Sequence, residues 1–410
     1  MYQNSGYTLT MTLHLPEIPR GFLKRTQKNQ APKSFLALDI GTASVKAALF
    51  SFLDNGHVTL LGFGRAHAED SAQIADAGLS AYNSIKSTAE NPYPVKNIIF
   101  GLSAKECYLT TTSVKISRKN PQSPITQKEI AQMTEKIQNT SYIESAQALA
   151  DKIGSDDVQT KLLNSDYIYT KVDGVEVANL DGYKGETVEA SLFSAFTTTE
   201  KIAELSKIAS DLNLKTAAIT SNIYTIVKAI KRKAGLSGNR VIIDIGGGAT
   251  DVAVIFGGGI AACLSISLGA SDIVDVIAKD LKVGIPDAQK LLDMYVGKNL
   301  DAESVAKVGG LIAKVAQMWS AGIEHLFKEF EGIKVFPGEI ILAGWGSAIS
   351  EYKNSLTGEW SKDIPFKSPP VFGNFGADYL DFIKSDKKDI LDKEGATLSL
   401  SLAAFELWHH

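Results

Sequence analysis

The sequence predicts an α/β protein built by internal duplication, in which two similar halves hold one ligand between them. Two stretches carry this prediction, "LALDIGTASVK" at residues 36–46 and "VIIDIGGGATD" at residues 241–251. Each is an apolar run typical of a buried strand that ends in Asp-Ile-Gly, and each opens a meander of three strands followed by helical patterns. One such stretch could arise by chance, whereas two at the same point of two meanders indicate a repeated unit.

Length and composition limit the possible functions. At 410 residues the chain is long enough for two or more domains. A net charge of −4 provides no positive field for a phosphate backbone, so nucleic acid is not an expected partner. The two cysteines, Cys107 and Cys263, lie far apart in apolar stretches. This pattern favours buried thiols in a reducing cytoplasm over a disulfide.

Two segments bear on membrane association. An uncharged run from Val252 to Ala270 approaches the length of a membrane span, but its centre, Gly257-Gly258-Gly259, predicts a turn between two buried strands. Residues 1–33 lack the early basic charge and the cleavage site of a signal peptide, and we expect a flexible extension there. A surface-binding helix or a partner-binding arm in the same segment is the alternative. Contact with a membrane is therefore expected to be peripheral or indirect, for instance at the inner face of the cell membrane.

A different block lies between the two meanders and is expected to be an inserted subdomain, residues 102–194. Its strand "ECYLTTTSVKI" is followed by a helix that opens at Thr126, where Glu129 completes a capping box, and that runs to about Leu163. The strands "SDYIYTKVDGVEVANL" and "ETVEASLFSAFT" close the block. After the second meander, helices lead to the strand "GEIILAGWG", and the chain is expected to finish as a helix over "EGATLSLSLAAFELW".

The two Asp-Ile-Gly turns have the chemistry of a phosphate site. A strand that ends in Asp39 or Asp244 places a carboxylate at the edge of a sheet, and the glycines after it let the backbone approach a ligand. Successive backbone N–H groups can then hold phosphate oxygens, with Thr42 and Thr250 as hydroxyl donors at equivalent offsets. A carboxylate beside a polyphosphate requires a divalent cation between them, so both aspartates are expected to bind Mg²⁺ through water. The turns therefore imply a Mg-nucleotide.

These motifs resemble the actin-like ATPases, and within them the cell-division actin FtsA and the pilus-assembly protein PilM. The likeness covers about residues 34–408 and rests on "LDIGTASVK" and "IDIGGGATDVAV" as phosphate loops and "IILAGWGSAI" as the adenosine loop. The insert lies where FtsA and PilM carry theirs. The resemblance implies an actin-like ATPase fold, with duplicated ribonuclease-H-like domains and a 1C-type insert. The expected divisions are 34–101 and 195–239 as 1A, 102–194 as 1C, 240–275 and 334–410 as 2A, and 276–333 as a reduced 2B.

The resemblance also implies the ligands and the residues that hold them. ATP and Mg²⁺ are the expected cofactors, with Asp39 and Asp244 as the catalytic and metal-binding carboxylates. The expected nucleotide-binding residues are Gly41, Thr42, Lys46, Gly246, Gly247, Gly248, Thr250, Glu324, Gly344, Trp345 and Gly346. Three of these have a second interpretation. Lys46 faces either the phosphates or solvent, Trp345 either stacks on adenine or fills a gap, and Glu324 either contacts the ribose or forms an exposed ion pair with Lys328.

The chain departs from the family pattern in ways that bear on activity. Thr220 and Ser221 stand where hydrolytic relatives tend to keep an acidic or amide side chain near the attacking water, so at most a slow Mg-dependent ATPase is expected. The 2B region is too short for the strands that FtsA has there, which weakens the expectation of FtsA-like filaments. The sequence ends at "LSLSLAAFELWHH" and does not include the amphipathic helix that tethers FtsA to membranes; His409-His410 mark either the native end or a point where the natural tail was removed.

The function expected from the sequence is a nucleotide-gated scaffold. The leading hypothesis is an FtsA-like cytoplasmic protein that self-assembles or recruits division proteins, with itself, an FtsZ-like protein or a membrane-protein peptide as partner. A PilM-like adaptor of type IV pilus assembly is the first alternative. A small-molecule kinase or exopolyphosphatase on the same fold is the second, although it would need a substrate pocket that the insert does not suggest.

Overall fold

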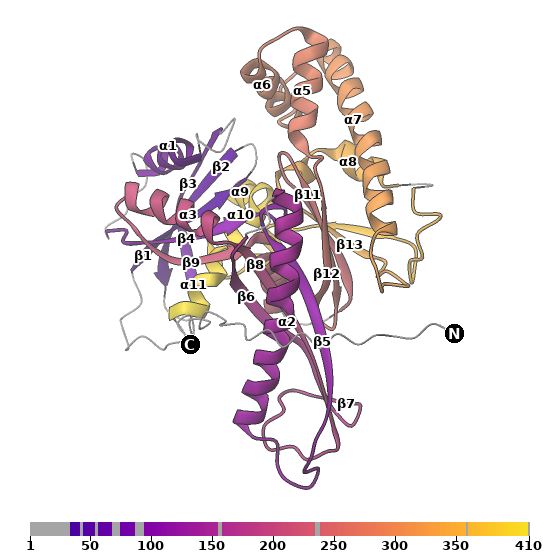
Figure 1. Cartoon of the computed structure of the whole chain (residues 1–410). Helices are drawn as coiled ribbons and strands as arrows, with labels where there is room; N and C mark the ends of the chain where they lie inside the picture. The colour runs from indigo at the N-terminus through magenta and orange to yellow at the C-terminus, as the bar shows by residue number, and fades with distance from the viewer. Residues whose placement is uncertain are drawn as a thin grey trace. The chain divides into compact units, whose positions relative to one another are not determined.

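Two mixed β-sheets of the same design form the frame of the molecule. The computed structural model describes residues 33–41, 44–53, 56–67, 74–86, 94–154, 158–233, 238–357 and 360–408. The expected N-terminal extension (all but Lys33) and Thr42 lie outside these residues. The elements follow one another along the chain as coloured in Figure 1.

The first sheet has six strands in the order β15-β3-β2-β1-β4-β9, and the second has five in the order β12-β11-β10-β13-β14. The strands of the first sheet are β1 (Ser34–Ile40), β2 (Ser44–Leu53), β3 (His57–His67), β4 (Asn97–Leu102), β9 (Lys215–Ser221) and β15 (Ile383–Lys384). Those of the second are β10 (Arg240–Ile245), β11 (Thr250–Phe256), β12 (Gly259–Ile266), β13 (Glu339–Ala343) and β14 (Val371–Asn374).

The two sheets repeat each other strand by strand, which explains the repeated sequence motif. In each, a three-stranded antiparallel meander is extended by two parallel strands, so that β1 lies between β2 and β4 just as β10 lies between β11 and β13. Strands β11 and β12 account for the uncharged run, and the turn between them places Gly257 and Gly258 at positive φ. Among the described residues, no helix is both long and apolar enough to cross a membrane.

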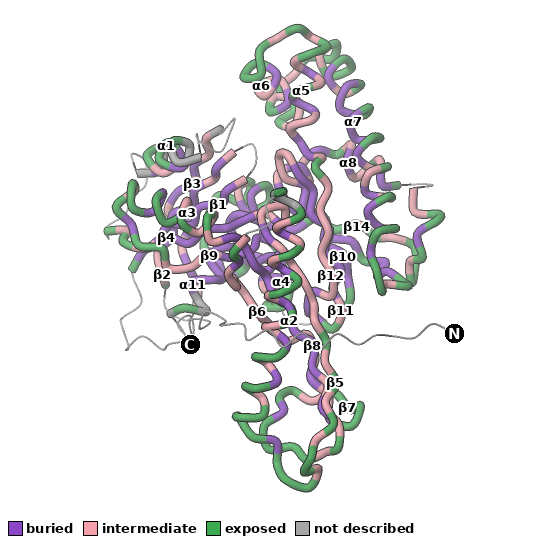
Figure 2. Tube along the Cα trace, in the orientation of Figure 1, coloured by how far each residue is buried: buried purple, intermediate pink, exposed green. Residues whose placement is uncertain are grey.

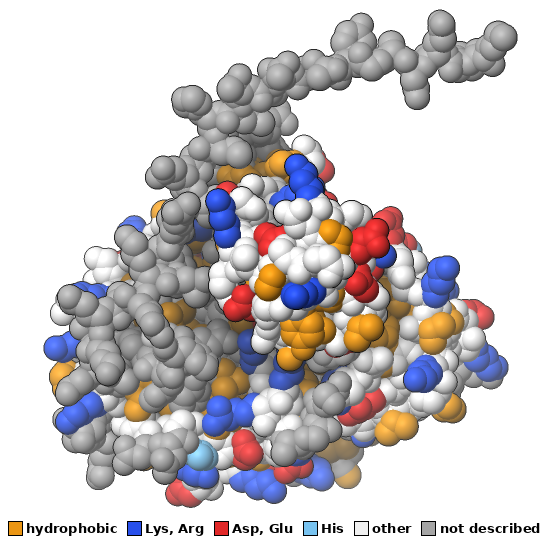
Figure 3. All heavy atoms as spheres, turned by 90° about the horizontal axis from the view of Figure 1, so that it is seen from below, with side chains coloured by type: hydrophobic (Ala, Val, Ile, Leu, Met, Phe, Trp, Pro, Cys, Tyr) orange, Lys and Arg blue, Asp and Glu red, His pale blue; other side chains and the backbone are white. Residues whose placement is uncertain are grey.

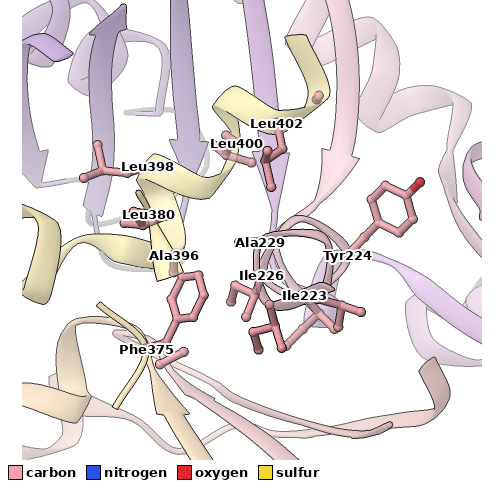
Figure 4. Packing of buried hydrophobic residues seen from close by; sticks show 14 of the residues in the cluster. Ile223, Tyr224, Ile226, Ala229, Phe375, Leu380, Ala396, Leu398, Leu400 and Leu402 are labelled. Atoms are coloured by element: carbon pink, nitrogen blue, oxygen red, sulfur yellow. The ribbon is translucent and has the colours of Figure 1, made fainter. Parts of the chain in front are cut away.

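A shared hydrophobic core joins the facing sides of the two sheets. Phe35 and Ala37 of β1 and Ile242 of β10 belong to this one cluster, together with residues of β13. Helices α4 (Asn222–Arg232), α10 (Gly395–Ser399) and α11 (Ser401–Trp408) supply much of the rest. Figure 4 shows Ile223, Ile226 and Ala229 near Phe375 and Ala396 in this cluster. The halves are therefore held by apolar contact, with polar groups only where the strands end.

The outer faces of the sheets have their own helices and cores. On the first sheet, α1 (Ile74–Lys86) and α3 (Thr199–Asp211) cover a cluster that includes Leu36 and Leu38. On the second, a cluster is shared by α5 (Ala270–Leu281), α6 (Ile285–Val296), α7 (Ala302–Lys328) and α8 (Ser350–Ser355), in which α7 packs against β12 and α6 packs against α5 and α7. Between β12 and β13 the described chain forms helices α5, α6 and α7 and no strand, and the assignment of 276–333 as a reduced 2B region stays a prediction. Figure 2 shows that burial concentrates in the sheets, while the outer helices expose one side.

The insert is a four-stranded sheet packed on one long helix. Its strands, in the order β5-β8-β6-β7, are β5 (Tyr108–Ser117), β8 (Thr187–Thr198), β6 (Thr160–Val172) and β7 (Val175–Val177). The helix, α2 (Gln127–Ile153), starts with the expected capping box of Thr126 and Glu129. The expected end near Leu163 is wrong. Gly154 adopts a left-handed conformation with φ of 72°, which ends the helix, and β6 starts soon afterwards.

The C-terminal segment returns to the first half of the molecule. Strand β15 pairs with β3, and α10 and α11 pack against strands of the first sheet. The final helix is also broken, because α9 (Lys388–Lys393), α10 and α11 are separate. The boundary that places all of 334–410 in 2A thus needs correction from Ile383 onward. An apolar helix does not reveal from its sequence which sheet it will cover.

Charged side chains are mixed over the face shown in Figure 3. There, Lys and Arg lie among Asp and Glu, with apolar side chains between them. The part of that face made by described residues carries no continuous basic stripe of the kind that binds nucleic acid. This distribution agrees with the low net charge of the sequence.

The capping box of α2 gives a test of local stability. We expect Thr126→Ala to lower the free energy of unfolding by about 1 kcal/mol, because the backbone N–H of Glu129 would lose its acceptor. Urea denaturation followed by circular dichroism measures the change. Thr140→Ala is the matched control, since the Thr140 hydroxyl donates only to Lys136 O within the same helix. An equal loss in both variants would contradict the capping role.

Candidate functional site

The two predicted phosphate turns are closed by equivalent backbone hydrogen bonds. In the first, the N–H of Gly41 donates to Ser44 O at 3.1 Å, and in the second the N–H of Gly246 donates to Ala249 O at 2.9 Å. Each turn joins the first two strands of its meander, β1 to β2 and β10 to β11. The aspartate of each motif is the second-last residue of its strand. The sequence repeat is therefore a repeat of backbone structure.

Glycine is required at both turns because the backbone closes tightly on itself. A Cβ at position 41 would lie 2.8 Å from Ser44 O, and one at position 246 would lie 3.0 Å from Ala249 O. Gly41, Gly246, Gly247 and Gly248 are half-buried, so their backbone is partly open to solvent. Main-chain N–H groups in such turns can bind the oxygens of an anion.

Each aspartate starts a row of three cross-strand neighbours on one face of its sheet. In the first half, Asp39 pairs with Lys46 and Lys46 pairs with Arg65. In the second half, Asp244 pairs with Asp251, which in turn pairs with Ser265. Directly opposed residues of antiparallel strands project to the same side. The rows occupy matching positions but carry opposite charge, two cations beside one carboxylate in the first half and two carboxylates in the second.

Asp39 is buried and fully supplied with partners. It is 3% exposed, and it accepts hydrogen bonds from Asn222 Nδ2 at 2.8 Å and from Thr397 Oγ1 at 2.6 Å. Lys46 Nζ lies 3.3 Å from Asp39 Oδ2 and 3.8 Å from Glu394 Oε2. Lys46 therefore points toward the carboxylates of the site, and not to open solvent.

Asp244 is buried but has no such partners. It is 8% exposed, and within the described part of the chain no hydrogen-bond donor reaches its carboxylate. Burial, and then the charge of Asp251, raise the pKa of Asp244 to about 7, although Lys46 lowers it. Asp39 also raises this pKa, so the two aspartates lie within electrostatic reach of each other. The structure brings them together at one junction between the halves.

The predicted adenosine loop packs directly against Asp244. Gly344 has φ of +76°, and a Cβ there would lie 2.4 Å from Asp244 Oδ1. A Cβ on Gly346 would lie 2.3 Å from a methyl group of Ile245. Between them, Trp345 opens the short helix η4 (Trp345–Ala348), is half-buried, and stacks under the guanidinium of Arg65 at 5.1 Å. The two glycines are thus needed for close contact with the end of β10.

Two of the expected nucleotide ligands are engaged elsewhere. The Thr250 hydroxyl is inaccessible to solvent, donating to Leu268 O at 2.7 Å and accepting from Trp319 Nε1 at 2.9 Å. Thr250 pairs with Ile245 as Val45 pairs with Ile40, so the equivalent of Thr250 in the first repeat is Val45 and not Thr42. Glu324 forms an ion pair with Lys328 at 2.8 Å, the second of its two interpretations. Their roles toward a nucleotide stay predictions.

Four residues at the site were not anticipated from the sequence. Asn222 and Thr397 bind Asp39, and Glu394 approaches Lys46. The fourth, Asp251, closes the second motif and could have been found from its place in "GGGATD". The other three come from helices far along the chain and have no local signature.

Asp251 connects the site to the insert. Its Oδ2 accepts the N–H of Ala104 at 2.7 Å, and its Oδ1 accepts the Ser265 hydroxyl at 2.7 Å. Ala104 begins the short helix η3 (Ala104–Glu106) that leads into β5. Farther along β5, the Thr111 hydroxyl donates to Ile260 O at 2.7 Å. The start of the insert is therefore bonded to β11 and β12 of the second half.

The donor set fits a magnesium-bound nucleotide. Carboxylate and water oxygens are the ligands that Mg²⁺ prefers, and it usually binds through only one or two carboxylates plus phosphate oxygens. Within the described residues no group of three acidic, histidine or cysteine side chains could hold a metal alone. Asn222 Oδ1, beside Asp39, is buried and has no donor among the described residues, which suits a water carried by a cation. Asp39 and Asp244 would hold the cation, and the turns the phosphates.

Comparison with known proteins gives a distant but consistent result. No protein-family model matches the sequence. Over 292 residues the chain is 23% identical to the cell division protein FtsA of Escherichia coli K12, and equally to that of Shigella flexneri. These matches cover 68% of this chain, and 66% and 63% of the two relatives, so the chain spans less than two thirds of their length.

A solved structure extends the similarity over nearly the whole chain. The PilM–PilN type IV pilus biogenesis complex aligns with a TM-score of 0.57 at 14% identity. The alignment covers 92% of this chain and 99% of that one. The chain is thus similar to FtsA in sequence and to PilM in fold, and its fold is that of the actin-like ATPases.

Proposed function

We propose that this protein binds ATP with Mg²⁺ at the junction of its two halves and uses the nucleotide to control an assembly. The observation that carries the proposal is the pair of matched glycine turns, each preceded by a buried aspartate, Asp39 in one half and Asp244 in the other. Asp244 is buried and has no hydrogen-bond donor in the described residues, and burial raises its pKa to about 7, so ionising this carboxylate is costly. A cation supplied with the nucleotide would relieve this cost.

The same site is poorly equipped for hydrolysis. Thr220 and Ser221 are buried, and both are bonded to Asn164 Oδ1, through the Thr220 hydroxyl at 2.8 Å and the Ser221 N–H at 3.2 Å. The amide that does reach the site, Asn222, donates to Asp39. Orienting the attacking water is a main task of the protein in phosphoryl transfer. We therefore infer slow or absent hydrolysis, with nucleotide acting as a switch.

For the assembly itself, two candidates have support. An FtsA-like scaffold that self-assembles or recruits division proteins is supported by the sequence similarity to FtsA. A PilM-like adaptor that binds a peptide of a pilus membrane protein is supported by the alignment with PilM in its complex with PilN, which extends over almost the full chain. Either function would place the protein in the cytoplasm near the membrane.

Nucleotide binding can be measured by equilibrium titration with a fluorescent ATP analogue. We expect saturable binding that depends on Mg²⁺, and we expect Asp244→Ala to weaken it about 10-fold or more, because the cation would lose a ligand. Glu189→Gln is the control, since that carboxylate pairs with Lys115 in the insert at 2.7 Å. Binding that is absent with Mg²⁺ present, or indifferent to Asp244→Ala, would refute the proposed site.

Removing the buried charge should stabilise the metal-free protein. Asp244 has its pKa raised from 3.8 to about 7 in the folded state, so its contribution to stability is present at low pH and is lost as the pH rises through 7. We expect Asp244→Asn to raise the free energy of unfolding at pH 8 by about 1–3 kcal/mol, and by less at pH 5.

Thermal unfolding without Mg²⁺ or nucleotide, at both pH values, measures this effect. Asp166→Asn serves as the control, because the Asp166 carboxylate is paired with Lys228 at 2.8 Å and is partly exposed. A lower free energy of unfolding for Asp244→Asn than for the wild type at pH 8 would contradict the prediction, because it would mean that the ionised carboxylate stabilises the fold.

The two assemblies can be separated by peptide binding. We expect the nucleotide-loaded protein to bind one of two peptides, the C-terminal tail of an FtsZ-like protein or the cytoplasmic segment of a PilN-like protein. Fluorescence anisotropy with each labelled peptide, with and without Mg-ATP, identifies the partner class. Equal and nucleotide-independent binding of both peptides would count against a nucleotide-controlled adaptor.

A further inference from the structure

One contact links the two halves at the site without belonging to either phosphate turn. Arg65 is the third residue of the row that starts at Asp39, near the end of β3. Its guanidinium carbon lies 5.1 Å from the centroid of the Trp345 ring, which belongs to the second half. A guanidinium within about 6 Å of an indole centroid is attracted to the face of the ring. This cation–π pair therefore draws the halves together.

The pair lies beside the carboxylates of the site. Arg65 is in register with Lys46, which contacts Asp39. On the opposite side, Trp345 follows Gly344, whose backbone packs against Asp244 Oδ1. The Lys46 side chain is only 12% exposed, and both aspartates are buried. Both carboxylates are therefore largely shielded from solvent in this arrangement.

Arg65 is also incompletely bonded in the closed junction. Its Nε is buried and has no hydrogen-bond partner in the described part of the chain, and no carboxylate there forms an ion pair with it. A buried donor without an acceptor costs free energy. The stacking on Trp345 thus holds Arg65 where its Nε lacks a hydrogen bond. Breaking this contact would let Arg65 Nε bond to water, which lowers the free-energy cost of opening.

We propose that Arg65 and Trp345 form a latch that keeps the junction closed in the nucleotide-free protein and that must release before Mg-nucleotide enters. The second part rests on the proposed nucleotide function, whereas the closing role of the latch does not. Trp345 occupies the adenosine loop, so an adenine that stacks on this indole must first displace Arg65. The latch thereby couples entry of the base to separation of the halves.

Hydrogen exchange of the nucleotide-free protein tests the latch directly. We expect Arg65→Ala and Trp345→Leu each to speed amide exchange about 2- to 10-fold in the peptides that contain Asp39 and Asp244, because opening becomes more frequent. The double variant should exchange no faster than either single one, since each removes the same contact. Trp345→Phe should restore part of the protection, because it keeps an aromatic face.

Arg232→Ala is the matched control, because it removes a similar contact, 5.3 Å from the Phe382 ring, within the first half. Unchanged exchange in Arg65→Ala, or effects of the two single variants that multiply in the double variant, would overturn the latch. Stopped-flow mixing with the fluorescent ATP analogue then tests its link to nucleotide. Association should be about 2- to 10-fold faster in Arg65→Ala than in the wild type.

The outcomes separate the two proposals. Faster exchange in Arg65→Ala, with no nucleotide binding by any variant, would leave the latch in place and refute the proposed function. Nucleotide binding by the wild type with an association rate unaffected by Arg65→Ala would leave the function in place and refute the latch as the gate to the site.

Discussion

The arrangement of the site depends on two buried carboxylates, Asp39 and Asp244, which lie near the ends of β1 and β10. Burying like charges is unfavourable unless each finds compensation. Asp39 finds it in Asn222, Thr397 and Lys46. Asp244 has only the distant attraction of Lys46 within the described residues, and its raised pKa records the deficit. The apolar core is therefore well packed, whereas the buried charge of Asp244 lacks compensation from the described residues.

This imbalance arises from a duplication whose two copies have diverged in charge. The backbone turns, the strand order and the positions of the aspartates are the same in both halves. The neighbours in the rows differ, Lys46 and Arg65 in one half and Asp251 and Ser265 in the other. In the first half, Lys46 neutralises Asp39 and Arg65 contacts Trp345 across the junction. In the second half, the cation that lowers the pKa of Asp244 is Lys46 of the first half. The two halves thus combine a similar strand arrangement with an asymmetric distribution of charge.

The sequence was sufficient for the parts of the site that lie within one local motif. Asp39, Asp244 and the turn glycines follow from a repeated pattern whose backbone geometry is local, and the capping box of α2 is local as well. Asn222, Thr397 and Glu394 could not be found in this way, because tertiary packing brings them from distant helices to Asp39 and Lys46. Thr250 was matched to Thr42 from the sequence alone, but the strand registers make Thr250 equivalent to Val45, and its hydroxyl accepts from Trp319.

The hydrogen bond between Asp251 and the backbone of Ala104 couples the orientation of the insert to the position of the second half at the site. By covalent connection the insert belongs to the first half, yet Asp251 and Ile260 tie its base to the second half as well. If the halves separate, these tethers either break or tilt the whole four-stranded sheet. Force applied at the far end of the insert and a ligand bound between the turns would therefore act on the same two contacts, those of Asp251 and Ile260.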